Sequence, residues 1–186
     1  MRWLIASVLV IGCGAVGLNA LQGAKLAGAA PIIAVDIGSA KLSRAMQFGA
    51  TVTIDASAPD ALEQIRALTG GRGADYVFEA AGSKATLRLS VEAVRPAGEV
   101  VWLGKIGVNE EVSFRWGSLM GEKRIVRSSY GGASPQRDFP WIVEQYLEGR
   151  LKLDELITRR IALDDINDGF AALARGDGVR TVIEFA

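Results

Sequence analysis

The chain carries Gly12-Cys13-Gly14-Ala15-Val16-Gly17, a glycine-rich stretch that decides the fold we expect. An apolar run from Ser7 to Ile11 precedes it, and a helical pattern follows it. Gly12 permits a sharp turn out of a strand, Gly14 lets a ligand approach the backbone, and Gly17 lets a helix pack closely on that strand. The first turn of such a helix offers free N–H groups and a partial positive charge, which together favour phosphate binding.

An acidic residue stands at the distance that a dinucleotide site needs. Asp36 ends a second apolar run, 19 residues after Gly17. A carboxylate there accepts hydrogen bonds from the adenosine ribose hydroxyls and repels a 2′-phosphate, and Ile37 supplies no compensating cation. We therefore expect NAD rather than NADP as the cofactor. Lys41 is within reach of the same ribose, although a solvated helix lysine explains it equally well.

The composition excludes several kinds of site. The 186 residues contain no histidine, which rules out Ser-His-Asp and Cys-His catalysis and any zinc site with an imidazole ligand within this chain. Cys13 is the only cysteine, so neither a disulfide nor a thiolate zinc site can form within the chain. It fills the variable slot of the glycine turn, and a reactive thiol at the helix N-terminus is the alternative. A lone cysteine also fits a reducing compartment, and we expect a cytoplasmic protein.

The charges and the apolar runs indicate which large partners to expect. Lysine plus arginine equals aspartate plus glutamate, at 21 each, so no net field draws the chain to nucleic acid or to anionic lipid. No apolar run approaches the ~20 residues of a transmembrane helix. We therefore expect neither a nucleic-acid partner nor a membrane.

Short β-branched runs alternate with helical stretches along most of the chain. Connections this short indicate parallel strands with right-handed crossovers, and six strands in two halves predict an α/β protein with a doubly wound parallel six-stranded sheet, the Rossmann fold. Glycine and proline at residues 96–98 are predicted to break the chain before the fifth strand. The expected strands are Val8–Ile11, Ile32–Val35, Val52–Ile54, Tyr76–Phe78, Val100–Leu103 and Ile125–Ser128. The expected helices are Val16–Leu26, Ala40–Phe48, Ala58–Thr69 and Ser83–Val94.

The last part of the chain does not continue this alternation. A helix expected there carries Phe139 and Val143 on one apolar face. We predict a nucleotide-binding domain over residues 1–150 and a small C-terminal helix-strand extension over residues 151–186. The elements expected after the six strands are a helix from about Pro135 to Glu148, a helix Asp165–Arg175 and a strand Thr181–Phe185.

The order of these motifs resembles the cofactor-binding half of the medium-chain, zinc-type alcohol dehydrogenases. The resemblance extends over nearly the whole chain, and it implies hydride transfer between NAD and an alcohol or aldehyde in the full-length family. In that family the C-terminal segment returns to the catalytic domain. The matching segments are Val8–Asn19, Ile32–Asp36, Gly73–Gly82, Met120–Arg124, Leu156–Thr158, Asp165–Phe170 and Val179–Ile183.

The resemblance also implies which residues hold the cofactor. Asp36 and Lys41 would hold the adenosine ribose. Arg180 would reach back to the pyrophosphate, although a surface arginine beside an edge strand explains it as well. The pyrophosphate would be cradled by Gly12, Gly14, Ala15, Val16 and Gly17. The nicotinamide ribose would lie against Ala80 and Ala81, the ring beside Leu103, Gly104 and Lys105, and its carboxamide near main-chain groups of Ser129 and Tyr130.

One departure from the family decides the expected activity. Only 11 residues precede Gly12, where the family has a catalytic domain with the zinc ligands, the proton relay and most of the substrate pocket. We therefore expect a truncated chain that binds NAD without efficient turnover, with zinc confined to the missing domain. A non-enzymatic NAD-binding module or partner subunit is the alternative. The family commonly dimerises by joining sheet edges, and we expect a homodimer through a sheet edge near Glu111–Arg115.

Overall fold

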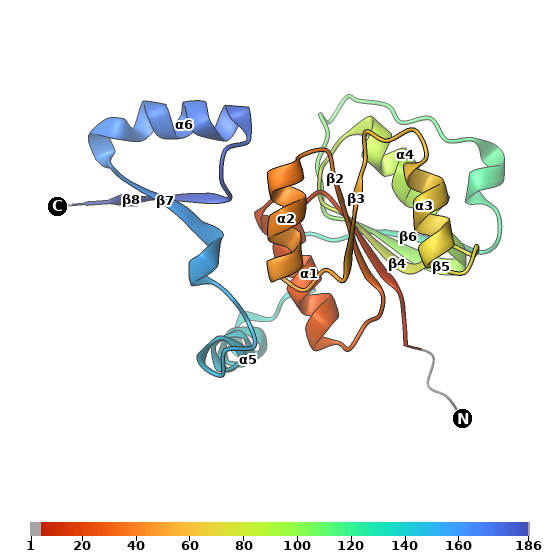
Figure 1. Cartoon of the computed structure of the whole chain (residues 1–186), viewed down its shortest axis with the longest axis horizontal. Helices are drawn as coiled ribbons and strands as arrows, with labels where there is room; N and C mark the ends of the chain where they lie inside the picture. Colours follow the sequence, from red (N-terminus) through yellow and green to blue (C-terminus); the bar gives the residue numbers. More distant parts are fainter. Residues whose placement is uncertain (1–4, 186) are drawn as a thin grey trace. The chain divides into compact units, whose positions relative to one another are not determined.

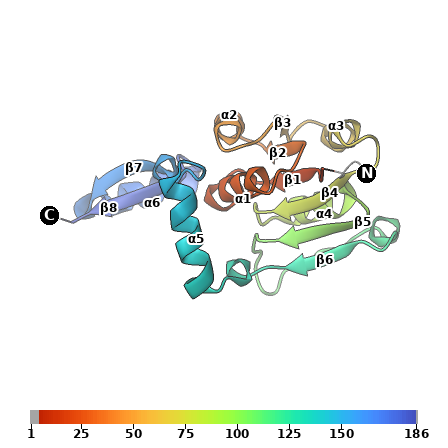
Figure 2. The ribbon, with the colours of Figure 1, turned by 90° about the horizontal axis from the view of Figure 1, so that it is seen from below.

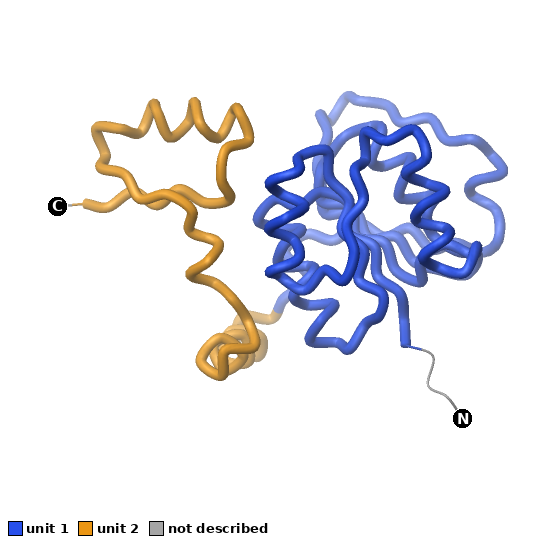
Figure 3. Tube along the Cα trace, viewed as in Figure 1, with its two compact units in different colours: residues 1–133 blue, residues 134–186 orange. Residues whose placement is uncertain are grey.

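The computed structural model describes residues 5–185, which divide into two compact units with the boundary between residues 133 and 134 (Figure 3). The first unit is a parallel sheet of order β3-β2-β1-β4-β5-β6, which confirms the predicted doubly wound fold. Helices α1 and α2 lie on one side of this sheet, and α3 and α4 lie on the other (Figure 1). The strands are β1 Val8–Ile11, β2 Ile32–Asp36, β3 Val52–Asp55, β4 Ala74–Glu79, β5 Val94–Trp102 and β6 Arg124–Arg127. The helices are α1 Ala15–Leu26, α2 Ser39–Gln47, α3 Ala61–Leu68 and α4 Lys84–Ala93.

The centre of the sheet is buried on both faces because its strands are continuously apolar. Every residue of β1 and β2 is buried, as a strand between two helical layers requires. Leu9 and Ile11 point to the face that α3 covers with Ile65, and all three are almost fully buried. Strand order reverses between β1 and β4, so the carboxyl ends of these two strands form the crevice in which ligands of such sheets bind.

The sheet differs from our expectation in two places. The predicted break at residues 96–98 does not end a strand, because β5 runs continuously from Val94 to Trp102. The ladder accommodates the proline and glycine by a shift of register opposite Ala74 and Tyr76, with Ala97 at φ 56°. Residues Glu111–Arg115, near which we expected a sheet edge, form no strand in the described structure, and the edge strands of the sheet are β3 and β6.

The second unit contains helix α5 Pro135–Leu147, strand β7 Ile157–Ala162, helix α6 Ile166–Arg175 and strand β8 Arg180–Glu184. Strands β7 and β8 pair in parallel as a two-stranded sheet (Figure 2). We expected α6 and β8, whereas β7 was not predicted. In α5 the expected apolar face is mostly exposed, with Phe139 at 60% and Val143 at 52%, while Gln145 is buried.

The division into units places α5 with the C-terminal elements, because the boundary falls just before it. Our assignment of residues 151–186 to a catalytic domain stays a prediction. Among residues 5–185, no helix is both long enough and apolar enough to cross a membrane.

The carboxylate of Asp75, near the amino end of β4, forms hydrogen bonds with Ser7, just before β1, and with Arg95 in β5. Asp75 Oδ2 accepts hydrogen bonds from the Ser7 backbone N–H at 2.8 Å and from the Ser7 hydroxyl at 2.7 Å. Asp75 Oδ1 accepts one from Arg95 Nε at 2.5 Å. Burial alone raises the pKa of this carboxyl, but the Ser7 and Arg95 contacts outweigh it and hold the pKa below its ordinary value of 3.8.

Replacing Asp75 by asparagine is expected to lower the free energy of unfolding by about 1–2 kcal/mol at pH 7, because charge-assisted hydrogen bonds are lost. The folded-state pKa lies below the unfolded one, so the contribution of Asp75 is complete above the unfolded pKa and disappears as pH falls through the folded pKa. Urea unfolding at several pH values between 7 and 3 measures this. A difference between wild type and Asp75→Asn that does not shrink toward low pH would contradict it.

Candidate functional site

In the turn between β1 and α1, a side chain would collide with backbone atoms at Gly12 and Gly17 but not at Gly14. A Cβ at Gly12, where φ is 95°, would lie 2.7 Å from the Ala81 nitrogen, and a Cβ at Gly17 would lie 1.7 Å from the Gly12 oxygen. A Cβ at Gly14 would meet nothing within 4 Å. Gly12 and Gly17 are therefore required by packing, whereas Gly14 leaves free space directly beside the backbone.

Helix α1 begins at this free space with its N–H groups uncapped. Gly14 is the N-cap residue, no side chain caps the helix, and the first turn contains no acidic residue. Val16, in the first turn, is 54% exposed. A helix of 12 residues has its full dipole at such an end, so the turn presents free donors and a partial positive charge to a ligand.

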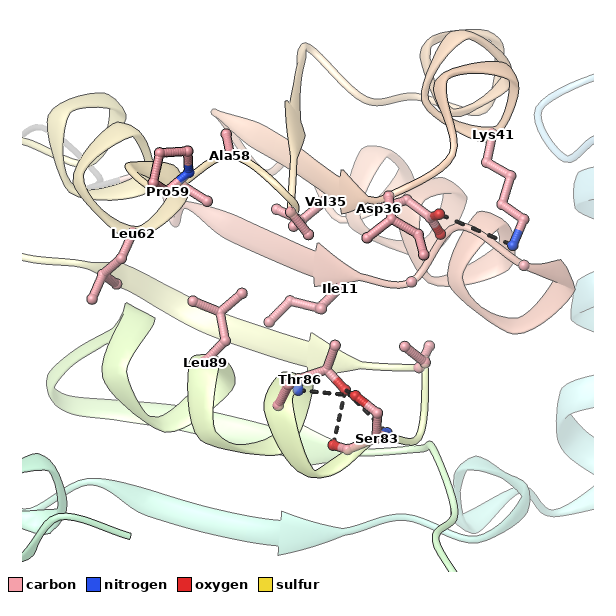
Figure 4. Close-up of a pocket in the computed structure, with 18 residues that line it drawn as sticks. Ile11, Val35, Asp36, Lys41, Ala58, Pro59, Leu62, Ser83, Thr86 and Leu89 are labelled. Atoms are coloured by element: carbon pink, nitrogen blue, oxygen red, sulfur yellow. Dashed lines mark hydrogen bonds and ion pairs between the residues drawn. The ribbon is translucent and has the colours of Figure 1, made fainter.

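A cleft of about 710 Å³ follows the carboxyl ends of β1, β2 and β4 (Figure 4). This size is typical of sites that take small molecules and cofactors. The cleft lies at the point where the strand order reverses, which is where ligands of such sheets bind. Predicted residues from all three strand ends line it, namely Gly12, Gly14, Asp36, Lys41, Ala80 and Ala81.

The carboxylate of Asp36 is fixed at the edge of this cleft. Oδ2 accepts a hydrogen bond from the Cys13 N–H at 2.7 Å, and Oδ1 accepts one from the Gly38 N–H at 2.9 Å. The Lys41 ammonium lies 4.0 Å from Oδ1, and Figure 4 shows the two side chains turned toward each other. The carboxylate is 8% exposed and held by backbone donors, so it can accept a ligand hydroxyl without first becoming ordered.

The strand ends on the far side of the crevice are held together by backbone contacts. The N–H groups of Leu103 and Gly104 both donate to the Glu79 carbonyl oxygen, at 2.8 and 2.9 Å. A Cβ at Gly82 would lie 2.6 Å from the Lys105 oxygen, so the loops after β4 and β5 touch. These loop residues do not line the cleft of Figure 4.

The other predicted residues lie farther from the cleft or in the second unit. Ser129 and Tyr130 follow β6, two strands away from β4, and Tyr130 is 95% exposed with φ at 53°. Arg180 begins β8 in the second compact unit, so its role in the site stays a prediction.

The comparisons with known proteins identify the family. A model of the zinc-binding dehydrogenase family matches residues 15–148. This chain is a member of the zinc-binding dehydrogenase family. The resemblance read from the motifs is thus confirmed.

The relatives that this chain matches include alcohol dehydrogenases from several organisms. Alcohol dehydrogenase-like 6 of Arabidopsis thaliana is 36% identical over 182 residues, which cover 96% of this chain and 47% of that protein. The S-(hydroxymethyl)glutathione dehydrogenase of Saccharomyces cerevisiae is 35% identical, with 96% of this chain and 47% of that protein covered. The chain spans about half the length of these curated relatives.

Solved structures agree with this assignment. Benzyl alcohol dehydrogenase from Acinetobacter calcoaceticus superposes with a TM-score of 0.91 at 32% identity, over 97% of this chain and 50% of that one. A zinc-binding dehydrogenase from Sinorhizobium meliloti, solved with bound NADP, superposes with a TM-score of 0.81 at 30% identity, over 96% of this chain and 52% of that one.

Several residues of the cleft were not predicted as part of the site. An apolar wall is formed by residues of and before α3 and α4, namely Ala58, Pro59, Leu62 and Leu89 (Figure 4). Ser83 and Thr86 also line the cleft and cap α4 reciprocally, with Thr86 N–H donating to Ser83 Oγ and Ser83 N–H donating to Thr86 Oγ1, both at 3.1 Å. The Ser-x-x-Thr spacing before an apolar helix was a readable sign of this cap.

The thiol of Cys13 is buried, with the residue only 1% exposed, which does not suit a reactive nucleophile. Burial, reinforced by the neighbouring Asp36 carboxylate, raises the pKa of the thiol to about 12, although Lys41 opposes the shift. The alternative of a reactive thiol is therefore wrong, and Cys13 serves the turn through its backbone. Across residues 5–185, no cluster of three or more histidine, cysteine or acidic side chains could hold a metal ion.

Proposed function

We propose that this chain is an NAD-binding domain of an alcohol dehydrogenase-like oxidoreductase. The observation that carries the proposal is the β1–α1 turn, where a Cβ at Gly14 would meet only free space beside uncapped helix N–H groups. The residues present fit a dinucleotide, since a backbone cradle for phosphates stands next to a fixed carboxylate for a ribose. A nicotinamide cofactor bound there supplies a hydride acceptor or donor.

The choice of NAD over NADP rests on the charge at the ribose end of the cleft. Asp36 presents a negative charge at the cleft edge, and among residues 5–185 its only cation partner within 4 Å is Lys41 at 4.0 Å. Ile37, the next residue, is 74% exposed and brings no positive charge. A 2′-phosphate at this place would meet a carboxylate, so NAD is favoured. A relative of the same family was solved with NADP, so the preference that we propose rests on the residues at this edge and not on family membership.

We assign the predicted residues to parts of the cofactor on this basis. The pyrophosphate lies at the turn of Gly12, Gly14, Ala15, Val16 and Gly17, and the adenosine ribose at Asp36 and Lys41. The nicotinamide half lies toward Ala80 and Ala81 and the loops that follow β5 and β6, with Leu103, Gly104, Lys105, Ser129 and Tyr130. The contacts of Ala81 with Gly12, and of Leu103 and Gly104 with Glu79, support this placement. That Arg180 also contacts the pyrophosphate stays a prediction, because this residue begins β8 in the second unit.

The chemistry of the whole enzyme needs residues outside this chain. Hydride transfer between NAD and an alcohol or aldehyde in zinc-type relatives takes a Lewis acid, and this chain has no histidine and a single, buried cysteine. We propose that residues 151–186 join a catalytic domain in the complete protein. By itself the chain holds the cofactor and orients it, with little turnover.

We also propose a cytoplasmic homodimer that joins at β6. This strand is at the edge of the sheet, and Val126 within it is 37% exposed. An open edge offers unpaired backbone groups to a second copy. A molecular mass of one chain in light scattering across a wide concentration range would contradict the dimer.

The experiment that tests the proposed function is a calorimetric titration of the chain with NADH and with NADPH. We expect NADH to bind and NADPH to bind at least about tenfold more weakly, because only NADPH places a 2′-phosphate beside the Asp36 carboxylate. A parallel assay with zinc and a panel of alcohols should show no appreciable turnover. Absence of NADH binding would contradict the proposal, and zinc-dependent turnover would contradict its assignment of catalysis to residues outside this chain.

A further inference from the structure

Glu79 is a polar residue at a position where the sheet surrounds it with apolar side chains. It is the last residue of β4, it is completely buried, and its register neighbours are Ile11 on β1 and Trp102 on β5. Burying a carboxyl group costs free energy unless hydrogen bonds compensate for it. The sheet alone would favour an apolar residue here, so the contacts of the carboxyl group must explain it.

The contacts of Glu79 lead to the loop that lines the cleft. Oε1 accepts hydrogen bonds from the Ala81 N–H at 3.0 Å and from the Gly82 N–H at 2.7 Å. The backbone oxygen of Glu79 accepts two more, from Leu103 and Gly104. One residue therefore holds the loop after β4 through its side chain and the loop after β5 through its main chain.

The second carboxyl oxygen of Glu79 is enclosed between the loops that follow β4 and β5. Oε2 is buried without a hydrogen-bond partner in the described structure. A Cβ at Gly104 would lie 2.5 Å from Oε2 and 2.5 Å from the Gly82 nitrogen, so only glycine fits beside the carboxyl. An unpaired buried oxygen is a cost to stability, which leaves the two hydrogen bonds to the loop as the gain.

We propose that Glu79 is a positioning residue for the nicotinamide half of the cofactor. This inference rests on the proposed function. The Glu79 side chain fixes Ala81 and Gly82 against the Gly12 turn on one side, where a Cβ at Gly12 would touch the Ala81 nitrogen, and against Gly104 on the other. The adenosine half does not depend on it, because Asp36 is held separately by the N–H groups of Cys13 and Gly38.

The test compares a whole cofactor with its adenosine half. Glu79→Leu removes both side-chain acceptors at similar size, and Glu79→Gln keeps the Oε1 acceptor. We expect Glu79→Leu to weaken NADH binding roughly tenfold while AMP binding changes less than about twofold, and Glu79→Gln to stay within about threefold of wild type for both. Without any ligand, amide exchange at Ala81 and Gly82 should be about tenfold faster in Glu79→Leu, since two N–H groups lose their acceptor.

A carboxyl at the opposite end of the same strand provides the control. Asp75→Asn should lower the melting temperature and leave the ratio of NADH to AMP affinity unchanged, as expected for a residue that only stabilises the fold. If Glu79→Leu does not fold, Gly104→Ala tests the same junction, because its Cβ would collide with Oε2, and the same split between NADH and AMP is expected.

The outcomes separate this inference from the proposed function. Equal losses of NADH and AMP affinity in Glu79→Leu, no loss of either, or unchanged amide exchange would overturn the role of Glu79 while the proposed function stands. A wild-type chain that bound neither NADH nor AMP would overturn the proposed function and this inference with it.

Discussion

Gly17→Ala is expected to destabilise the chain by about 3 kcal/mol or more. The new Cβ would lie 1.7 Å from the Gly12 carbonyl oxygen. The backbone fixes the position of both atoms, so no side-chain rotation can relieve the clash. Gly12 is itself fixed, because its N–H donates to the Val35 oxygen at 2.7 Å. The helix packs on β1 and would have to move away from it, although its Leu18 and Leu21 are fully buried.

Gly23→Ala is the matched control for this change. Gly23 lies in the same helix, and a Cβ there would meet nothing within 4 Å. Alanine is the better helix former, so we expect a gain of up to about 1 kcal/mol. Urea unfolding followed by circular dichroism measures both variants. Equal stabilities for Gly17→Ala and Gly23→Ala would show that the close approach of α1 to the turn is not real.

Asp36→Asn is expected to weaken NADH binding by roughly tenfold to a hundredfold and to abolish the preference over NADPH. The variant loses a charged acceptor for the ribose hydroxyls and also the repulsion of a 2′-phosphate, so the two cofactors move in opposite directions. Calorimetric titration with each cofactor measures the ratio of the two affinities.

Asp55→Asn controls for the loss of a strand-end carboxylate. Asp55 pairs with Asp36 in register, at the end of β3, and its carboxylate accepts from the N–H and hydroxyl groups of Ser57 outside the cleft. Its substitution should change NADH affinity less than about twofold. A similar loss of NADH affinity in both variants would contradict the assignment of the ribose to Asp36.

The core of the fold could be predicted because local signals and burial agreed there. The central strands β1 and β2 are continuous apolar runs between glycine turns, and a strand buried on both faces has no other pattern. The glycine spacing predicted the β1–α1 turn for a physical reason, since Gly12 and Gly17 touch backbone that admits no Cβ.

The edges of the molecule were less predictable because tertiary context overrides local signals there. Pro96 looked like a break, yet β5 absorbs it in a bulge at an edge of the ladder. Strand β7 was missed because its sequence, Ile157–Ala162, is half polar and mostly exposed, and the strand pairs only with β8.

The candidate site was predictable in its polar part and not in its apolar wall. Asp36 was found from its distance to the glycines, because one carboxylate must meet one ribose. Leu62 and Leu89 line the same cleft, but their sequence pattern indicates only apolar helix residues that face a core. Glu79 was quoted within a motif and given no role, since nothing in the sequence reveals that its oxygen accepts from two loop N–H groups.

The central claim is that cofactor phosphates bind against bare backbone at Gly14. Calorimetric titration of Gly14→Ala with NADH, alongside Gly23→Ala, tests it most directly. The Gly14 side of the turn is free of protein atoms, so the account predicts a change of less than about 1 kcal/mol in the free energy of unfolding. It predicts, at the same time, an NADH affinity at least about tenfold lower than that of Gly23→Ala. Undiminished NADH binding by a well-folded Gly14→Ala chain would contradict the claim.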